Sequence, residues 1–170
     1  MVEIARAGAA LAEARARGQR LEHLPGGLPA DQASAYAIQR AACAARGMAV
    51  CGWKIGATSP ETQRILGADQ PMAAPLFEAE RQADGAVIEM PDFGRFGIEP
   101  EFAVRLSADL PARAEPYTRP EVAAAVASVH PAFELIGLRL PDDVLQNVLA
   151  VIADFGANTG FVAGAGVTDW

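Results

Sequence analysis

The stretch GIEPEFAVRL, residues 97–106, alternates in the manner of a β-strand. A period of two places Glu99 and Glu101 on one face of that strand, with Ile98 and Phe102 defining their surroundings. Like charges side by side repel, so an enclosed pair must be protonated, matched by cations or bound to a metal. Hard divalent cations such as Mg²⁺ or Mn²⁺ suit such oxygen ligands. The alternative is a solvent-facing strand with two surface glutamates.

A third carboxylate, Glu134, lies within the apolar run VHPAFELIG, residues 129–137. A charged side chain in such a run needs a partner if it points inward. Together with the Glu99 and Glu101 pair, it strengthens the case for a metal site, and the alternative of surface glutamates stays open. Taken alone, Glu134 is also compatible with an outward-facing residue or a member of a salt bridge.

Lys54 is the fourth candidate, in the segment CGWKIGATSP, residues 51–60. A strand that passes into a turn at this point would project the amine into a cleft. There the amine would either hold a substrate carboxylate as a point charge or move a proton once burial lowers its pKa. The alternative is a solvated lysine at the end of a strand.

Other motifs carry less chemistry. Two unclustered histidines, His23 and His130, are more typical of structural or exposed positions than of catalysis. The sequence has no serine nucleophile elbow and no cysteine pair at metal-binding spacing. The glycine-rich residues 160–166 lack the order of a dinucleotide site and indicate a strand and turn. Asp154 is interpreted first as a loop cap and second as a group that reaches a cleft.

The order of the expected elements indicates an α+β fold, with helices first and a mixed sheet after them. Strong helix formers, caps and glycine stops predict the helices, whereas short β-type runs between Pro, Gly and Asp predict the strands. The expected helical segments are residues 2–17, 31–47, 60–67 and 142–152, together with an alanine-rich helix that follows a capping box at residues 118–121. The expected strands are residues 49–55, 86–90, 97–106, 129–138 and 160–163.

Length and charge limit the classes of function. A chain of 170 residues favours one globular unit, and the net charge of −7 argues against a nucleic-acid partner. A small anionic substrate is still compatible with that charge, because one local cation and a metal can outweigh it. Two cysteines are too few for a disulfide framework, so a cytoplasmic location is expected. Neither a signal peptide nor a membrane span is expected.

Four segments, in the same order, resemble the 2-keto-4-pentenoate hydratase and 4-oxalocrotonate decarboxylase group of the fumarylacetoacetate hydrolase superfamily. They are residues 31–39 with their AYAIQ, GWKIGATS at 52–59, IEPEFA at 98–103, and PAFELI at 131–136 continuing through Ile152-Ala-Asp154. The resemblance implies an N-terminal helical segment over residues 1–48. It also implies the front part of a mixed β-roll over residues 49–170, which together with the helices forms one structural unit.

The resemblance also implies roles for the four candidates. Glu99, Glu101 and Glu134 correspond to ligands of a divalent metal, Mg²⁺ or Mn²⁺, and Lys54 corresponds to the active-site lysine. The implied reaction adds water to a 2-hydroxy-2,4-dienoate (a 2-oxo-enoate) and gives a 4-hydroxy-2-oxo acid, in aromatic-compound degradation. Decarboxylation of a 4-oxalocrotonate-type acid is the alternative, because these four residues do not separate the two reactions.

Two departures from the group's pattern bear on activity. Members commonly carry a polar or acidic residue and a Gly where this chain has Met72, Ala73 and Ala74, so a proton-transfer partner is expected to be missing. The resemblance covers only the front part of a typical member, which leaves open a truncated, non-catalytic remnant or subunit. An incomplete roll would expose an edge or an apolar face, so a homo-oligomer or a hydratase or decarboxylase partner subunit is expected.

Overall fold

Most helices and strands lie where the sequence pattern predicts them. The computed structural model describes residues 2–89 and 96–170. The α-helices are α1 (Val2–Arg17), α2 (Gln32–Arg46), α3 (Pro60–Leu66), α4 (Arg119–Ala125) and α5 (Val148–Ala153). The strands are β1 (Val50–Gly56), β2 (Met72–Phe77), β3 (Arg81–Gln82), β4 (Phe96–Leu106), β5 (Val126–Gly137) and β6 (Asn158–Ala163). Single 3₁₀ turns cover Glu78–Glu80, Asp142–Val144 and Phe155–Ala157.

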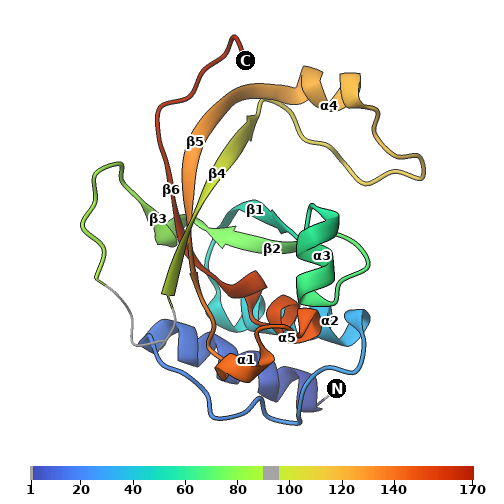
Figure 1. The fold of residues 1–170 in the computed structure, drawn as a ribbon, viewed down its shortest axis with the longest axis vertical. Helices are drawn as coiled ribbons and strands as arrows, with labels where there is room; N and C mark the ends of the chain where they lie inside the picture. The colour runs from blue at the N-terminus through green and yellow to red at the C-terminus, as the bar shows by residue number, and fades with distance from the viewer. Residues whose placement is uncertain (1, 90–95) are drawn as a thin grey trace.

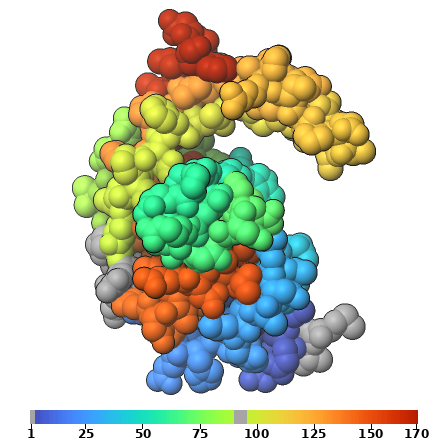
Figure 2. All heavy atoms as spheres, turned by 45° about the vertical axis from the view of Figure 1, so that its right-hand side comes forward, coloured from blue at the N-terminus to red at the C-terminus, as the bar shows by residue number. Residues whose placement is uncertain are grey.

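The strands form two sheets. β1 and β2 make an antiparallel hairpin, and the other sheet has the order β3-β6-β5-β4. β3 runs parallel to β6, whereas β6, β5 and β4 pair antiparallel, so this sheet is mixed. In Figure 1, α1, α2 and α5 gather at one end of the long strands, and α4 lies at the other end of β5. Figure 2 shows the α4 segment arching away over a hollow.

The predicted helix caps are present as side-chain hydrogen bonds. Asp31 accepts from the backbone N–H of Ser34, and the Ser34 hydroxyl in turn accepts from the backbone of Asp31. Ser59 caps α3, and Thr118 with Glu121 forms the predicted capping box of α4. Such caps satisfy N–H groups that the first helical turn leaves without partners. Local sequence therefore sets where these helices begin.

The hydrophobic core joins the helical end to the sheets. Leu11 of α1, Ile38 of α2 and Ile152 of α5 are buried in one cluster with Phe77 of β2. Residues on both sides of residue 48 therefore share this core, while the division of the chain there stays a prediction. No helix in the described part of the chain is long and apolar enough to cross a membrane.

Four segments differ from the predictions, one of them the two-residue strand β3, which was not predicted. Residues 86–89 form no strand, and Val87 is 96% exposed without a neighbouring strand, while Met90 lies outside the described residues. The strand β2, which begins at Met72, was not predicted, because alanines and a proline carry no β pattern. Instead of one helix over residues 142–152, the structure has a 3₁₀ turn followed by α5. The helix α5 begins only after Asn147, whose side chain caps it by accepting from two backbone N–H groups.

A buried ion pair fastens the end of β5 to the turn before β6. The side chains of Arg139 and Asp154 are fully buried, with Nε and Oδ1 2.7 Å apart. Asp154 also accepts from the backbone N–H of Arg139 at 2.6 Å. Burial lowers the pKa of Arg139 to about 10 and raises that of Asp154, since desolvation disfavours both charged forms. Asp154 is thus a buried ion-pair residue whose carboxylate also caps a backbone N–H of the preceding loop, and the alternative prediction of a cleft residue is wrong.

Replacing Asp154 with Ala leaves the buried guanidinium of Arg139 without its carboxylate. We expect the free energy of unfolding to fall by about 3–5 kcal/mol. The double variant Arg139→Met/Asp154→Leu removes both charges and is expected to lose less than the single variant. Urea unfolding followed by circular dichroism measures both losses, and an equal or larger loss in the double variant would contradict the account.

Candidate metal centre

The register of β4 and β5 brings the three predicted carboxylates together. Glu99 lies directly opposite Glu134, and Glu101 lies opposite Ala132, two residues away on the same face. One carboxylate oxygen from each glutamate lies within 4.8 Å of the others. Glu99 and Glu101 are exposed, whereas Glu134 is buried. The arrangement is an acidic cluster that is open on the side of the edge strand β4.

Glu134 is the member whose environment is least like water. Its burial raises the pKa of the carboxyl, and the nearby charge of Glu99 acts in the same direction. Lys54 and a hydrogen bond from Asn158 oppose this rise, because both favour the ionised form. The Asn158 amide nitrogen lies 3.0 Å from Oε1 of Glu134. Glu134 therefore faces inward and joins a salt bridge, so the outward-facing alternative is wrong.

Lys54 reaches the cluster from the β1–β2 hairpin. It pairs with Ala74 across the hairpin, and its Nζ lies 3.0 Å from Oε1 of Glu134. The ammonium also donates to the carbonyl oxygen of Gly156 at 3.0 Å. Gly156 has a φ of 64°, and a Cβ there would lie 3.0 Å from the Ala74 Cβ and 3.2 Å from the Lys54 Cδ. Glycine at this position lets the backbone approach the lysine.

The formal charge of the cluster fits a divalent cation. Three ionised carboxylates and the ammonium of Lys54 leave a formal charge of −2. All the anionic donors are oxygens, the ligand type preferred by hard cations such as Mg²⁺, Mn²⁺ and Ca²⁺. Burial of Glu134 makes an unmatched negative charge costly there. The residues present therefore fit a resident divalent metal.

Sequence reasoning missed several polar residues beside the site. Asn158 is buried at the start of β6 and contacts Glu134 directly. Arg15 of α1 and Arg139 both donate to the main-chain oxygen of Asn158. A lone Asn or Arg has no spacing signature, although an Arg flanked by apolar residues, as in the LRL of residues 138–140, signals burial. His130 contacts Ser128 and the Gly164 carbonyl, which is consistent with a structural residue.

Two side chains of the AYAIQ segment form hydrogen bonds with the backbone of β2. The Tyr36 hydroxyl accepts from the N–H of Ala73, and the Gln39 side chain donates to the Ala73 carbonyl. Gln39 also donates to the carbonyl of Ile152 in α5. This segment therefore positions β2 against the helices. Met72 and Ala74 are buried in β2, so the residues that depart from the group's pattern present no titratable side chain beside Lys54.

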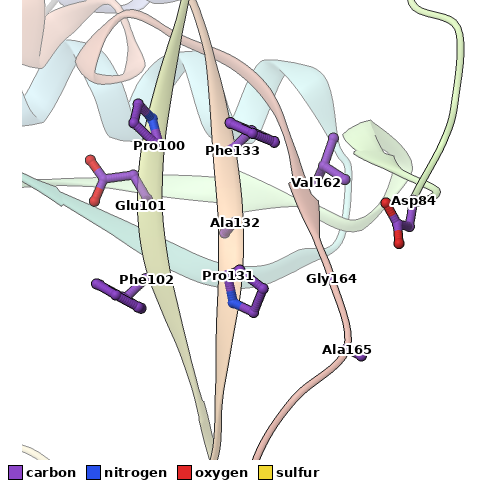
Figure 3. Close-up of a pocket in the computed structure, with 10 residues that line it drawn as sticks. All are labelled: Asp84, Pro100, Glu101, Phe102, Pro131, Ala132, Phe133, Val162, Gly164 and Ala165. Carbon is purple, nitrogen blue, oxygen red and sulfur yellow. The ribbon is translucent and has the colours of Figure 1, made fainter.

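The opposite face of β4 and β5 is apolar and exposed. Ile98, Phe102 and Phe133 point away from the carboxylates by strand periodicity, and they are 60%, 82% and 50% exposed. A pocket of about 450 Å³ lies along these strands. Figure 3 draws the residues that line it, which come from both faces. The pocket is lined by Asp84, Pro100, Glu101, Phe102, Pro131, Ala132, Phe133, Val162, Gly164 and Ala165. We call Ile98, Phe102 and Phe133 the outer apolar face.

Curated relatives match between 74% and 95% of the chain. No protein-family model matches it. A 2-keto-4-pentenoate hydratase from Burkholderia vietnamiensis is 34% identical over 169 residues, which are 95% of this chain and 62% of the relative. The corresponding enzyme from Paraburkholderia phymatum is 32% identical over 92% of this chain and 60% of its own length. A 2-hydroxyhexa-2,4-dienoate hydratase from Comamonas testosteroni is 33% identical over 74% of this chain and 47% of its own.

Solved structures agree with these matches. The 4-oxalocrotonate decarboxylase from Pseudomonas putida G7, complexed with magnesium and adipate, superposes with a TM-score of 0.81 at 26% identity. The match covers 95% of this chain and 64% of that one. The chain thus spans about 60% of the length of the first two hydratases. By sequence and by its α+β fold, the chain is similar over nearly its whole length to the 2-keto-4-pentenoate hydratase and 4-oxalocrotonate decarboxylase group.

Proposed function

We propose that the protein is a metal-dependent hydratase that adds water to a 2-hydroxy-2,4-dienoate and gives a 4-hydroxy-2-oxo acid, in aromatic-compound degradation. The observation that carries the proposal is the convergence of Glu99, Glu101 and Glu134 beside the ammonium of Lys54. The names of the curated relatives, which are hydratases of such acids, support the same reaction.

The three carboxylates would hold Mg²⁺ or Mn²⁺. The related decarboxylase contains magnesium in one structure and calcium in another, which supports a hard divalent cation. When bound, such a cation supplies Lewis acidity toward the carboxylate and 2-oxygen of the substrate. Because Glu99 and Glu101 are exposed, the substrate would approach from the side of β4.

Lys54 would bind the substrate anion and move a proton. Hydration removes the proton of the 2-hydroxyl, adds protons to carbons 3 and 5, and places the hydroxyl of water on carbon 4. An ammonium has three N–H donors, and two of those of Lys54 have partners in Glu134 and Gly156. The third has no partner among residues 2–89 and 96–170 and would donate to a substrate oxygen. Since β2 brings no titratable side chain between Met72 and Phe77, we assign the proton transfer to Lys54.

Decarboxylation of a 4-oxalocrotonate-type acid is the second candidate. It is favoured by one observation, the superposition on a decarboxylase at a TM-score of 0.81. A third possibility is a non-catalytic subunit that keeps the cluster and needs a hydratase or decarboxylase partner for a complete pocket. The three are separated by the product that the isolated chain forms from each acid.

We expect the Mn²⁺-loaded chain to convert 2-hydroxypenta-2,4-dienoate to 4-hydroxy-2-oxopentanoate, with loss of the dienol absorbance and the product identified by NMR. Lys54→Met is expected to lower kcat about 10²–10⁴-fold, the usual range for a lost proton-transfer group. EDTA should abolish turnover and Mn²⁺ should restore it. Arg64→Met, which removes an exposed cation of α3, serves as the control and should leave kcat unchanged.

Two other results of this assay would contradict the hydratase proposal. Release of carbon dioxide from 4-oxalocrotonate, without hydration of the dienoate, would replace the hydratase by the decarboxylase. If the folded, metal-loaded chain converts neither acid, the enzyme proposal for the isolated chain is wrong and the partner-subunit reading takes its place.

We also propose that the chain forms a homo-oligomer in the cytoplasm through the outer apolar face. Three exposed large apolar side chains on one sheet face, beside the edge strand β4, are typical of an association surface. Cys43 and Cys51 are free thiols, which is consistent with a reducing compartment.

Sedimentation velocity at micromolar concentration is expected to show a species larger than the monomer. The double variant Phe102→Ser/Phe133→Ser removes the two aromatic side chains of the outer apolar face and should shift the chain to a monomer. A wild-type chain that sediments only as a monomer would contradict the proposal.

A further inference from the structure

We propose that Asn158 is a positioning residue that fixes the carboxylate of Glu134. It holds Oε1, so that only the other oxygen, Oε2, is presented to a cation. Nothing in the strand pattern of Glu99, Glu101 and Glu134 requires this contact. The inference rests on the proposed function in one respect, namely that Glu134 is a metal ligand.

The side-chain amide of Asn158 has a partner for each of its hydrogens. Asn158 is fully buried, and its Nδ2 donates to Oε1 of Glu134 at 3.0 Å and to the carbonyl of Gly160 at 3.2 Å. Its Oδ1 accepts from Nη2 of Arg15 at 3.1 Å. A primary amide has two donor hydrogens, and both are used here. The side chain is therefore held on both sides.

The orientation of this amide follows from Arg15. A guanidinium donates hydrogen bonds and accepts none, so only the oxygen of Asn158 can face it. The NH₂ group must then face Glu134. The flipped amide would turn its NH₂ group toward the guanidinium of Arg15 and its oxygen toward Oε1 of Glu134 and the Gly160 carbonyl. It would leave these buried polar groups unsatisfied. The direction of the Asn158 amide is thus settled by chemistry.

Arg15 is itself held in place by several buried contacts. Its side chain is only 2% exposed and forms an ion pair with Glu80. It donates to the main-chain oxygen of Asn158 as well, and its guanidinium lies 4.7 Å from the ring centroid of Phe155. Since Arg15 belongs to α1, a contact chain runs from the N-terminal helix through Asn158 to Glu134.

Lys54 and Asn158 both donate to the same oxygen of Glu134. The two donor nitrogens each lie 3.0 Å from Oε1, so that oxygen is already occupied on two sides. The terminal torsion of a glutamate is soft, and without Asn158 the carboxylate can turn. Asn158 would therefore select single-oxygen ligation by Glu134 over chelation by both of its oxygens. Hydrogen bonds to ligating groups commonly set metal affinity in this way.

The test replaces Asn158 with Leu, which keeps the approximate shape and removes the donor. Calorimetric titration with Mn²⁺ is expected to show an affinity about 10–100-fold weaker than that of the wild-type chain. The matched control is Gln39→Leu, because Gln39 is another buried amide that donates only to backbone carbonyls among its described contacts. The control is expected to lose stability and to keep its Mn²⁺ affinity.

An infrared difference spectrum of the metal-loaded against the metal-free protein reports the ligation directly. The splitting between the antisymmetric and symmetric carboxylate bands is larger for one-oxygen ligation than for chelation. We expect Asn158→Leu to shrink the splitting of the band assigned to Glu134 through Glu134→Gln, whereas lower stability alone would not move it. If Asn158→Leu does not fold, Asn158→Ser, whose hydroxyl is too short to reach Glu134, is tested with the same expectations.

The two proposals fail in different ways. If the wild-type chain binds no Mn²⁺, the metal-dependent function fails. If the wild-type chain binds Mn²⁺ and the Asn158 variant has the same affinity and the same splitting, the positioning role is wrong while the metal site stands. An equal loss of affinity in Gln39→Leu would also overturn the role, because any buried amide would then have the same effect.

Discussion

A buried carboxylate has lost its hydrogen bonds to water and needs hydrogen bonds or an opposite charge from its neighbours instead. Glu134 obtains both, from two other elements of the fold. Its salt-bridge partner Lys54 comes from β1, and its amide donor Asn158 comes from β6. The hairpin must therefore lie against the larger sheet, and β6 must pair with β5 beside it. When Glu134 is placed in this way, its strand neighbours Glu99 and Glu101 complete an oxygen cluster.

The same rule holds deeper in the molecule, where the buried charges of the described residues lie in compensated groups. Asp154 pairs with Arg139, and Glu80 pairs with both Arg15 and Arg46. Buried pairs add little net stability over apolar packing, but an incorrect arrangement leaves a charge without its partner. Because Arg15 comes from α1 and Arg46 from α2, these pairs specify how the helical end in Figure 1 meets the sheets. The metal cluster is thereby held by contacts that begin far from it in sequence.

Sequence reasoning predicted features that depend on local spacing. Period-two alternation placed Glu99 and Glu101 on one face, and cap residues located the starts of the helices. Glu134 was found because a charge stood out in an apolar run. Asn158 was missed because its partner Arg15 lies 143 residues away, and no local pattern encodes such a contact. β2 was missed for a different reason, since it is built of small residues and its position depends on Tyr36 and Gln39 of α2.

The central claim is that carboxylates from β4 and β5 form one divalent metal site. Crystals of the chain soaked in Mn²⁺ would test it most directly, through anomalous difference maps recorded at the manganese edge. The account predicts a single strong peak among the carboxylates of Glu99, Glu101 and Glu134, with Oε2 of Glu134 nearer to it than Oε1. No peak at that position, or a peak only at other surface carboxylates, would contradict it.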